Sequence, residues 1–229
     1  LFGRDIPRVP RVAMASGLSG YGDKEYWDER YVKSGAKTYE WYLKYSDFRE
    51  KVLGALGLDS KNEDSDVGEK KAALRVLVVG CGNSALSDEL AKDGFTNVIS
   101  IDYSEVVVEQ MQKHFPELKF ETMDARELKF EPKHFDVVFD KGTLDAILCG
   151  SDSARSAGRM LWNVHKVMKP GSKFFVVTYG APQSRLNYLK NRRFQWDVTH
   201  CQLGTRHLYT LTKNVRQRRM MASGSGVHL

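Results

Sequence analysis

The chain has 229 residues, of which 41% are hydrophobic and 28% charged, and its net charge at pH 7 is +6. This composition is typical of a soluble globular protein with one domain, and it argues against a largely disordered chain and against a membrane protein. The three cysteines are far apart and odd in number. They therefore predict neither a disulfide framework nor a metal site, and they favour a reducing, cytoplasmic compartment.

The amino-terminal part of the chain predicts two helices and a loop. Residues 22–33 follow an amphipathic helical pattern that carries Trp27 and Tyr31, and a second helix is expected after Ser46, a good N-cap. Residues 59–71 are polar and charged without any periodicity, which predicts a mobile surface insertion.

The rest of the chain alternates between strands and helices. Apolar strands are expected at 74–79, 97–101, 118–121, 135–139 and 173–178, and helices at 84–92, after Ser104 as far as Pro116, and at 144–148 and 155–168. Residues 194–202 and 206–212 alternate apolar and polar side chains around a tight turn, which predicts a hairpin. The expected fold class is therefore α/β: a Rossmann-like, doubly wound, mostly parallel seven-stranded sheet with a terminal antiparallel hairpin.

The boundaries of this fold divide the chain into three parts. One folded domain is expected over residues 22–213, with the 59–71 insertion inside it. A flexible extension is expected at 1–21 and a flexible basic tail at 214–229. The excess of arginine and lysine late in the sequence leaves an anionic partner such as RNA open, although a solvated basic surface is the simpler interpretation.

A glycine-rich turn, Gly80-Cys81-Gly82, follows the first strand. Such a turn lets a ligand approach the backbone, although a tight strand-to-helix turn can need glycine without any ligand. Asp102 ends the second strand twenty residues after Gly82, which is the spacing of an acid that holds ribose hydroxyls. It could instead cap the helix that begins after Ser104.

Two further groups of residues follow the third and fourth strands. Asp124 lies just past the third strand, and residues 140–146 follow the fourth. Because ligands of open α/β sheets bind at the carboxyl ends of the strands, all these positions are expected at one site. The turn lacks the Lys-Ser/Thr pair of a phosphate-binding loop, so the ligand is predicted to be a nucleoside without phosphate. Residues 140–146 could alternatively be a simple strand exit and helix cap. The Lys141 ammonium is expected to pair with a carboxylate.

The sequence resembles a known family in several of its strings. They are Glu25 to Tyr31, Tyr39 to Trp41, Val79 to Ser87, Ile101 to Ser104, Met123 to Ala125, Asp140 to Ala146 and Tyr209 to Lys213. These strings are similar to those of class I S-adenosylmethionine-dependent methyltransferases, and in particular to the eukaryotic elongation factor 1-alpha lysine methyltransferases and their methyltransferase-like relatives. The resemblance implies a class I methyltransferase domain over residues 22–213.

The resemblance also implies a cofactor, an acceptor and roles for individual residues. The cofactor is S-adenosyl-L-methionine, and the acceptor is a lysine ε-amine of a protein such as elongation factor 1-alpha. Asp140 and Asp145 are the candidates for orienting that amine. Trp27, Tyr31 and Trp41 are expected to close over the cofactor, and Gly80 to lie beneath it, with Gly82 also counted as cofactor-binding. Asp102 and Tyr103 are expected to hold the ribose and adenine side, and Asp124 with Ala125 the adenine. Lys141 is expected near the methionyl end.

Two other functions remain open at the level of the sequence. One is methylation of a small molecule or of RNA, which the absence of an Asn-Pro-Pro-Tyr string after the fourth strand makes the weaker interpretation for nucleic-acid amines. The other is a non-catalytic protein with this fold that binds a partner through its basic surface. An intact set of Gly80, Asp102 and Asp124 argues against it.

Overall fold

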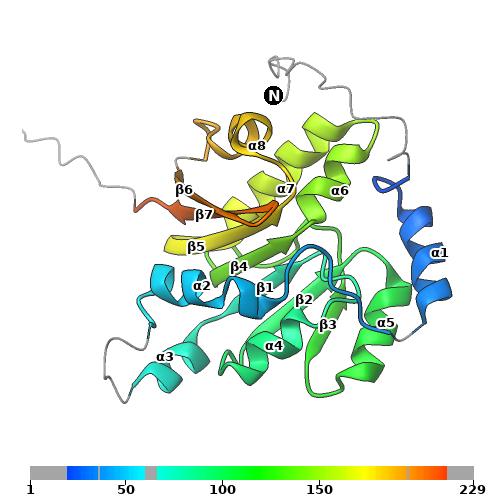
Figure 1. Ribbon diagram of the computed structural model, residues 1–229, viewed down its shortest axis with the longest axis horizontal. Helices are drawn as coiled ribbons and strands as arrows, with labels where there is room; N and C mark the ends of the chain where they lie inside the picture. Colours follow the sequence, from blue (N-terminus) through cyan, green and yellow to red (C-terminus); the bar gives the residue numbers. More distant parts are fainter. Residues whose placement is uncertain (1–19, 36, 60–65, 195, 216–229) are drawn as a thin grey trace, which may run out of the picture.

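The structure is a computed structural model that describes residues 20–35, 37–59, 66–194 and 196–215. One sheet lies between two layers of helices (Figure 1). Its strands are β1 (Val76–Val79), β2 (Val98–Asp102), β3 (Lys119–Thr122), β4 (Phe135–Lys141), β5 (Met168–Thr178), β6 (Trp196–Leu203) and β7 (Arg206–Lys213). The helices are α1 (Lys24–Ser34), the 3-10 helix η1 (Tyr45–Asp47), α2 (Arg49–Leu56), α3 (Val67–Ala73), α4 (Leu86–Lys92), α5 (Glu105–His114), α6 (Thr143–Cys149), α7 (Ser153–Val167) and α8 (Pro182–Leu189).

The strand order is β3-β2-β1-β4-β5-β7-β6. Strands β1 to β5 pair in parallel, while β7 pairs antiparallel with both β5 and β6. The first strand, β1, lies near the middle of the sheet, and the next two strands lead outward to β3. Strand β4 then lies on the other side of β1. Such a reversal opens a crevice at the carboxyl ends of the strands. The predicted fold class, including the terminal antiparallel hairpin, is confirmed.

Two hydrophobic cores lie on the two faces of the sheet, and β1 contributes to both. Val76 and Val78 pack into the core that is covered by α2, α4 and α5. Leu77 and Val79 pack into the core that is covered by α6, α7 and α8. Both faces of β1 are therefore buried, which explains why its sequence is a continuous apolar run rather than an alternating one.

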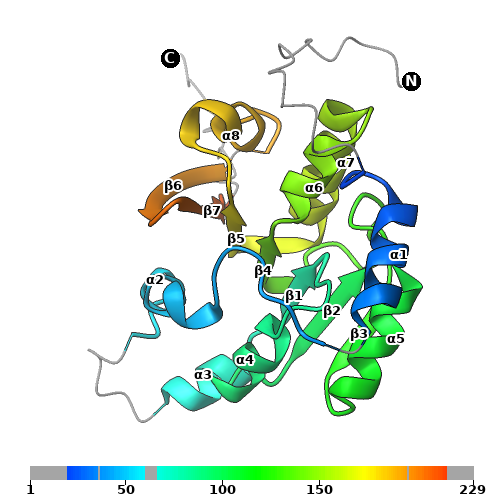
Figure 2. The ribbon, with the colours of Figure 1, turned by 45° about the vertical axis from the view of Figure 1, so that its right-hand side comes forward.

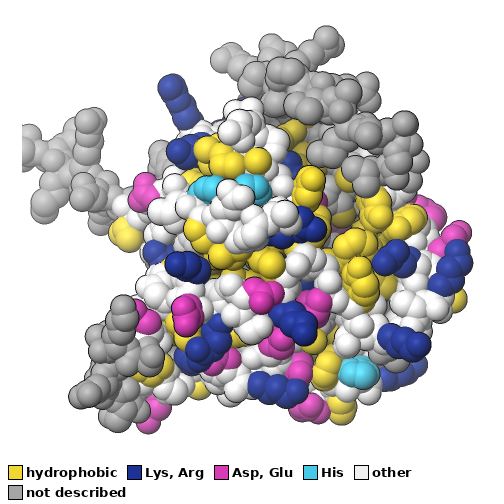
Figure 3. Space-filling view, viewed as in Figure 1, with side chains coloured by type: hydrophobic (Ala, Val, Ile, Leu, Met, Phe, Trp, Pro, Cys, Tyr) yellow, Lys and Arg dark blue, Asp and Glu magenta, His cyan; other side chains and the backbone are white. Residues whose placement is uncertain are grey.

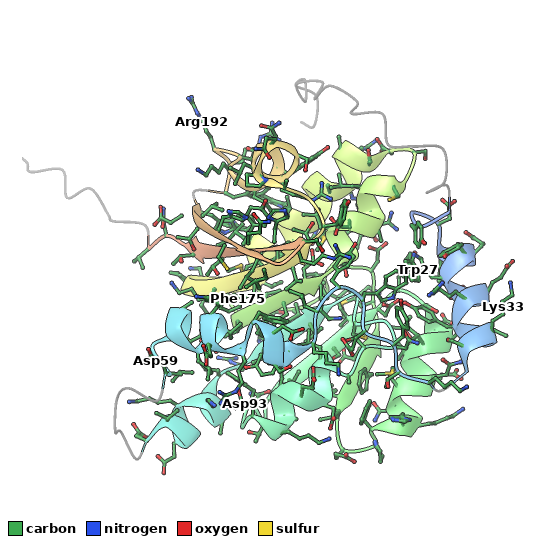
Figure 4. All side chains as sticks on the ribbon, in the orientation of Figure 1. Trp27, Lys33, Asp59, Asp93, Phe175 and Arg192 are labelled. Carbon is green, nitrogen blue, oxygen red and sulfur yellow. The ribbon has the colours of Figure 1, made fainter. Side chains whose placement is uncertain are left out.

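The prediction of a loop over residues 59–71 is wrong at its carboxyl-terminal end, because α3 begins at Val67. Lys71 is only 7% exposed, and its Nζ donates to the Asp93 backbone oxygen and to its carboxylate, each at 3.0 Å. Arg49 also donates to the carboxylate of Asp93, which is labelled in Figure 4. Polar composition could not reveal that this lysine finds a partner in the loop after α4. Residues 60–65 lie outside the described residues.

Other boundaries differ from the predictions in smaller ways. Ser104 caps α5 as expected, and its Oγ accepts a hydrogen bond from the backbone of Val107. Ser46 lies within η1 and is no N-cap, and α2 starts only at Arg49. Strand β5 begins at Met168, earlier than expected, and its pairing with β4 is irregular near this end. Helix α8 was not predicted.

The predictions for the two ends of the chain concern residues that mostly lie outside the described ranges. Residues 1–19 of the expected extension and 216–229 of the expected tail lie outside the described residues. None of the helices in the described ranges has the length and apolar character that crossing a bilayer requires.

Candidate active site

A cavity of about 470 Å³ lies at the carboxyl ends of the parallel strands, beside α1. Its volume is within the range of small-molecule sites, roughly 300–1,000 Å³. Figure 3 shows hydrophobic side chains gathered on the surface between α1 and the middle of the molecule. All the residues predicted to bind the cofactor line this one cavity: Trp27, Tyr31, Trp41, Gly80, Gly82, Asp102, Tyr103, Asp124, Ala125 and Lys141.

The glycine turn adopts a backbone that excludes side chains. Gly80 and Gly82 have φ angles of +57° and +51°, in the left-handed region that favours glycine. A Cβ atom on Gly80 would lie 2.1 Å from Thr143 Oγ1, and one on Gly82 would lie 2.9 Å from Tyr31 Oη. Close packing against Thr143 and Tyr31 therefore requires glycine at both positions, and the backbone of the turn lines the cavity.

Asp102 connects the glycine turn to the start of α5. One carboxylate oxygen accepts from Gly82 N at 2.9 Å, and the other accepts from Ser104 N at 3.0 Å. Burial raises the pKa of Asp102 to about 6, although these backbone hydrogen bonds act in the opposite direction. Each carboxylate oxygen has a second lone pair, so the same side chain can brace the turn and still accept hydroxyl groups from the cavity.

Asp124 forms an ion pair that was not predicted from the sequence. Nε and Nη2 of Arg126 donate to its carboxylate at 2.7–2.9 Å. Arg126 also lines the cavity, and its pairing with Asp124 raises its pKa. The only sequence signal for this partner is its position two residues after Asp124.

Lys141 is buried, and its ammonium is neutralised from another part of the chain. Its Nζ donates to Glu40 Oε2 at 2.8 Å and to the backbone oxygen of Trp41 at 3.0 Å. Glu40 also accepts from Ser84 Oγ and from the backbone N–H of Ala85. The predicted pairing of Lys141 with a carboxylate is confirmed, and Glu40 is the partner that the sequence did not identify. The pair ties the segment before η1 to the glycine turn.

The three predicted aromatic residues come together at one wall of the cavity. The rings of Trp27 and Tyr31 stack with centroids 5.7 Å apart, and the Trp41 ring meets Trp27 edge-on at 5.9 Å. Trp27 points from α1 toward the centre of the molecule, whereas Lys33 on the same helix points away (Figure 4). Helix α1 itself packs along α5, as Figures 1 and 2 show from two directions. The wall therefore rests on a helix that is separate from the strand ends.

Asp140 does not line the cavity, contrary to the expectation that it orients the acceptor amine. Its side chain is 1% exposed and accepts from the backbone N–H of Thr143 at 2.7 Å and of Leu144 at 3.1 Å. It therefore caps the start of α6. Burial and the nearby charge of Asp145 raise the pKa of Asp140 to about 7. The alternative interpretation, a strand exit and helix cap, describes this residue.

Asp145, the second candidate, does line the cavity. Its carboxylate accepts from Thr178 Oγ1 at 2.5 Å, from Tyr179 N at 2.9 Å and from the guanidinium of Arg185. Arg185 is 3% exposed, so the two charges neutralise each other inside the protein. Because Arg185 comes from the unpredicted helix α8, the sequence gave no indication of this partner.

Tyr42 is another cavity residue that the sequence did not predict. Its φ angle is 70°, which is uncommon for a bulky residue and marks a local conformation held by its surroundings. Its ring lies against Gly142, where a Cβ atom would come within 3.2 Å of it. Burial and the Asp145 carboxylate raise the pKa of Tyr42 far above its usual value, so its phenol stays neutral.

The sequence is similar to curated methyltransferases along most of its length. Residues 70–217 match a family described as a methyltransferase domain. EEF1A lysine methyltransferase 4 of Mus musculus is 38% identical over 192 residues, which cover 79% of this chain and 70% of the relative. The same enzyme of Bos taurus is 36% identical over 209 residues, covering 85% and 76%.

A second group of relatives is much longer than this chain. The eEF1A lysine and N-terminal methyltransferase of Danio rerio is 37% identical over 174 residues, which are 74% of this chain but only 22% of the relative. This chain thus corresponds to about a fifth of that protein.

Solved structures show the same fold at low sequence identity. A Pyrococcus horikoshii protein aligns with a TM-score of 0.57 at 16% identity, covering 81% of this chain and 99% of its own. An S-adenosylmethionine-dependent methyltransferase from Methanosarcina mazei aligns with a TM-score of 0.52 at 18% identity, covering 62% and 93%. At these identities the likeness concerns the fold alone.

Proposed function

Since this chain belongs to the S-adenosylmethionine-dependent methyltransferases, in the group that includes EEF1A lysine methyltransferase 4, we propose that its acceptor is a lysine ε-amine of elongation factor 1-alpha. One observation of the structure carries the proposal. The residues expected to hold the cofactor and the buried Asp145–Arg185 pair line a single cavity. The site can therefore bring a nucleoside cofactor and a second group together.

The cofactor would lie along the strand ends. Asp102 is proposed to accept the ribose hydroxyls, and Asp124 with Ala125 to hold the adenine. The bare backbone at Gly80 leaves room for the methionyl part, and Lys141 lies beside it. Because the Lys141 ammonium is already paired with Glu40, it is a less unfavourable neighbour for a positively charged sulfonium than a free cation would be. Trp27, Tyr31 and Trp41 would shield this group from water, since aromatic faces attract cations.

The bound cofactor supplies an activated methyl group, and the protein's contribution is to position and desolvate the amine. A lysine with an ordinary pKa of about 10.4 must lose its proton before it can attack. The charged side chains Asp145 and Lys141 at this end are each paired within the protein. An ammonium that enters therefore meets little uncompensated negative charge, and burial favours its neutral form. Holding the amine in line with the methyl group contributes several kcal/mol more, by positioning alone.

Transfer of a labelled methyl group tests this proposal. The purified chain, labelled S-adenosylmethionine and recombinant elongation factor 1-alpha should give label on a lysine that mass spectrometry can locate. A chain with Asp102→Ala serves as the control for cofactor dependence. If elongation factor 1-alpha stays unlabelled while another protein, a small molecule or RNA in a lysate takes the label, the proposed acceptor is wrong.

The location and partners of the chain follow from the same proposal. We propose that it acts in the cytoplasm, and the three cysteines support this because the structure shows each of them unpaired. The protein substrate is the proposed partner. Nucleic acid is not needed for the proposed reaction, and residues 216–229 of the expected basic tail lie outside the described residues.

A further inference from the structure

An arginine side chain lies between two tyrosine rings at the end of the cavity lined by Tyr42, Asp145 and Arg185, here named the acceptor end. The guanidinium carbon of Arg206 is 5.0 Å from the ring centroid of Tyr42 and 5.0 Å from that of Tyr179. Both tyrosines line the cavity, and Tyr179 is 63% exposed. The two rings come from segments far apart in the sequence, before η1 and after β5. The space between the two rings, hereafter the slot, already holds a cation.

Besides the two ring contacts, the described residues hold this guanidinium only through Thr205. Its Nη1 donates to Oγ1 of the adjacent Thr205 at 2.8 Å and to that residue's backbone oxygen at 3.3 Å. Its Nε is buried and has no hydrogen-bond partner among the described residues. Within the same residues, no carboxylate forms a salt bridge with Arg206, whereas Arg185 pairs with Asp145. A buried donor without a partner is unfavourable, so Arg206 is suited to leave this position when another cation takes it.

The slot opens toward the place where the methyl group is expected. The Tyr42 ring rests on Gly142, which directly follows Lys141 at the end of β4. Asp145, which also lines the cavity, lies close enough to Tyr42 to raise the pKa of its phenol. A long alkylammonium side chain could therefore pass between the rings and place its nitrogen beside residues 141–145.

We propose that Tyr42 and Tyr179 form the slot for the side chain of the acceptor lysine, and that Arg206 occupies this slot until the lysine displaces it. This inference rests on the proposed lysine methyltransferase activity. Lysine arrives protonated at neutral pH, and tyrosine faces attract an ammonium as they attract a guanidinium. The rings thus capture the charged form. Beyond the rings, Asp145 and Lys141 are already paired within the protein, so burial of the ammonium favours loss of its proton.

Steady-state kinetics with elongation factor 1-alpha as the acceptor tests the slot. Tyr179→Ala should raise the acceptor KM at least tenfold, and Arg206→Gln should lower it about threefold, because the competing cation is gone. Calorimetry should give an unchanged Kd for S-adenosylhomocysteine in both variants. Tyr179 is largely exposed, so its replacement is not expected to unfold the protein. Arg192→Ala, at an exposed arginine outside the cavity (Figure 4), is the matched control and should change none of these quantities.

A small probe separates this inference from the choice of acceptor protein. In the S-adenosylhomocysteine complex, n-butylammonium should shift the NMR signals of the Tyr42 and Tyr179 rings, and Arg206→Gln should tighten its binding. If these shifts appear while elongation factor 1-alpha takes no label, the acceptor protein is wrong and the slot stands. If label is transferred but Tyr179→Ala leaves the acceptor KM unchanged, or Arg206→Gln raises it, the slot is wrong. Absence of ring shifts in both the wild type and Arg206→Gln also overturns it.

Discussion

At the end of the cavity proposed to hold the cofactor (the cofactor end), Gly80, Asp102 and Asp124 each lie at or just after the end of a neighbouring parallel strand. At the acceptor end, Tyr42, Asp145, Tyr179, Arg185 and Arg206 come from five separate segments. The order of the strands brings the first group together, because parallel strands end at one edge of the sheet. A buried ion pair and aromatic contacts hold the second group together.

This difference predicts two kinds of response to substitution. At the cofactor end the backbone already has its shape, so the loss of one side chain should reduce affinity for the cofactor more than stability. At the acceptor end, Asp145 and Arg185 neutralise each other in the interior. Losing either of these two side chains should therefore reduce the free energy of unfolding itself, since a charge that stays buried without its partner is costly.

The largest effect is expected for Arg185→Met. It leaves the Asp145 carboxylate buried without its guanidinium, which should lower the free energy of unfolding by about 3–5 kcal/mol. Urea denaturation of the two proteins measures this difference. Arg192→Met is the control at an exposed site and should change stability by less than about 0.5 kcal/mol.

A double variant shows whether the ion pair itself is responsible. Asp145→Asn combined with Arg185→Met removes both charges, and it should recover a large part of the stability lost in Arg185→Met. A loss of less than about 1 kcal/mol in Arg185→Met would remove the proposed distinction between the two ends.

Asp140, between the two ends, should make stability depend on pH. Its pKa is raised to about 7 in the folded protein, against about 3.9 in an unfolded chain. Between these values the folded state holds a proton that the unfolded state has lost. The stability that Asp140 contributes is thus complete below about pH 4 and is lost as the pH rises to about 7.

The variant Asp140→Asn isolates this contribution, because its amide oxygen can still cap α6 and does not titrate. From pH 5 to pH 8, the wild type should lose about 2–3 kcal/mol relative to this variant, at about 1.4 kcal/mol for each pH unit below 7. Denaturation curves of both proteins at several pH values measure it. Parallel pH profiles would show that the Asp140 carboxyl ionises normally despite its burial.

The two ends also differ in how far the sequence could predict them. The apolar runs and the glycine turn predicted the central strands and placed the residues proposed to hold the cofactor at the ends of these strands, because these features depend on neighbours in the chain. Glu40 and Arg185 were missed because their roles depend on distant partners: Glu40 pairs with a lysine 101 residues away, and Arg185 pairs with an aspartate 40 residues away. Helix α3 was missed for the same reason, since Lys71 is buried only through its pairing with Asp93.

Asp102→Ala tests the cofactor end directly. If this carboxylate accepts the ribose hydroxyls, the variant should bind S-adenosylhomocysteine at least tenfold more weakly, about 1.4 kcal/mol by calorimetry. Its stability should fall less than that of Arg185→Met, because the N–H of Gly82 lies at the cavity and can bind water instead. Glu117→Gln, an exposed acid after α5, is the control. If the affinity for S-adenosylhomocysteine is unchanged in Asp102→Ala, the role of Asp102 is limited to bracing the glycine turn.

The smallest effect is expected for Ser104→Ala, and it asks whether the cofactor end depends on α1. Ser104 Oγ caps α5 and also donates to Asp28 of α1 at 2.5 Å. Loss of the cap should cost about 1 kcal/mol of stability in urea denaturation. Cofactor affinity should fall no more than about threefold, because Gln110 still donates to the backbone oxygen of Tyr31 at 3.1 Å and keeps α1 against α5. A loss of affinity as large as that of Asp102→Ala would mean that the aromatic wall, and not the strand ends alone, fixes the cofactor. The cofactor end would then depend on contacts between distant side chains as much as the acceptor end does.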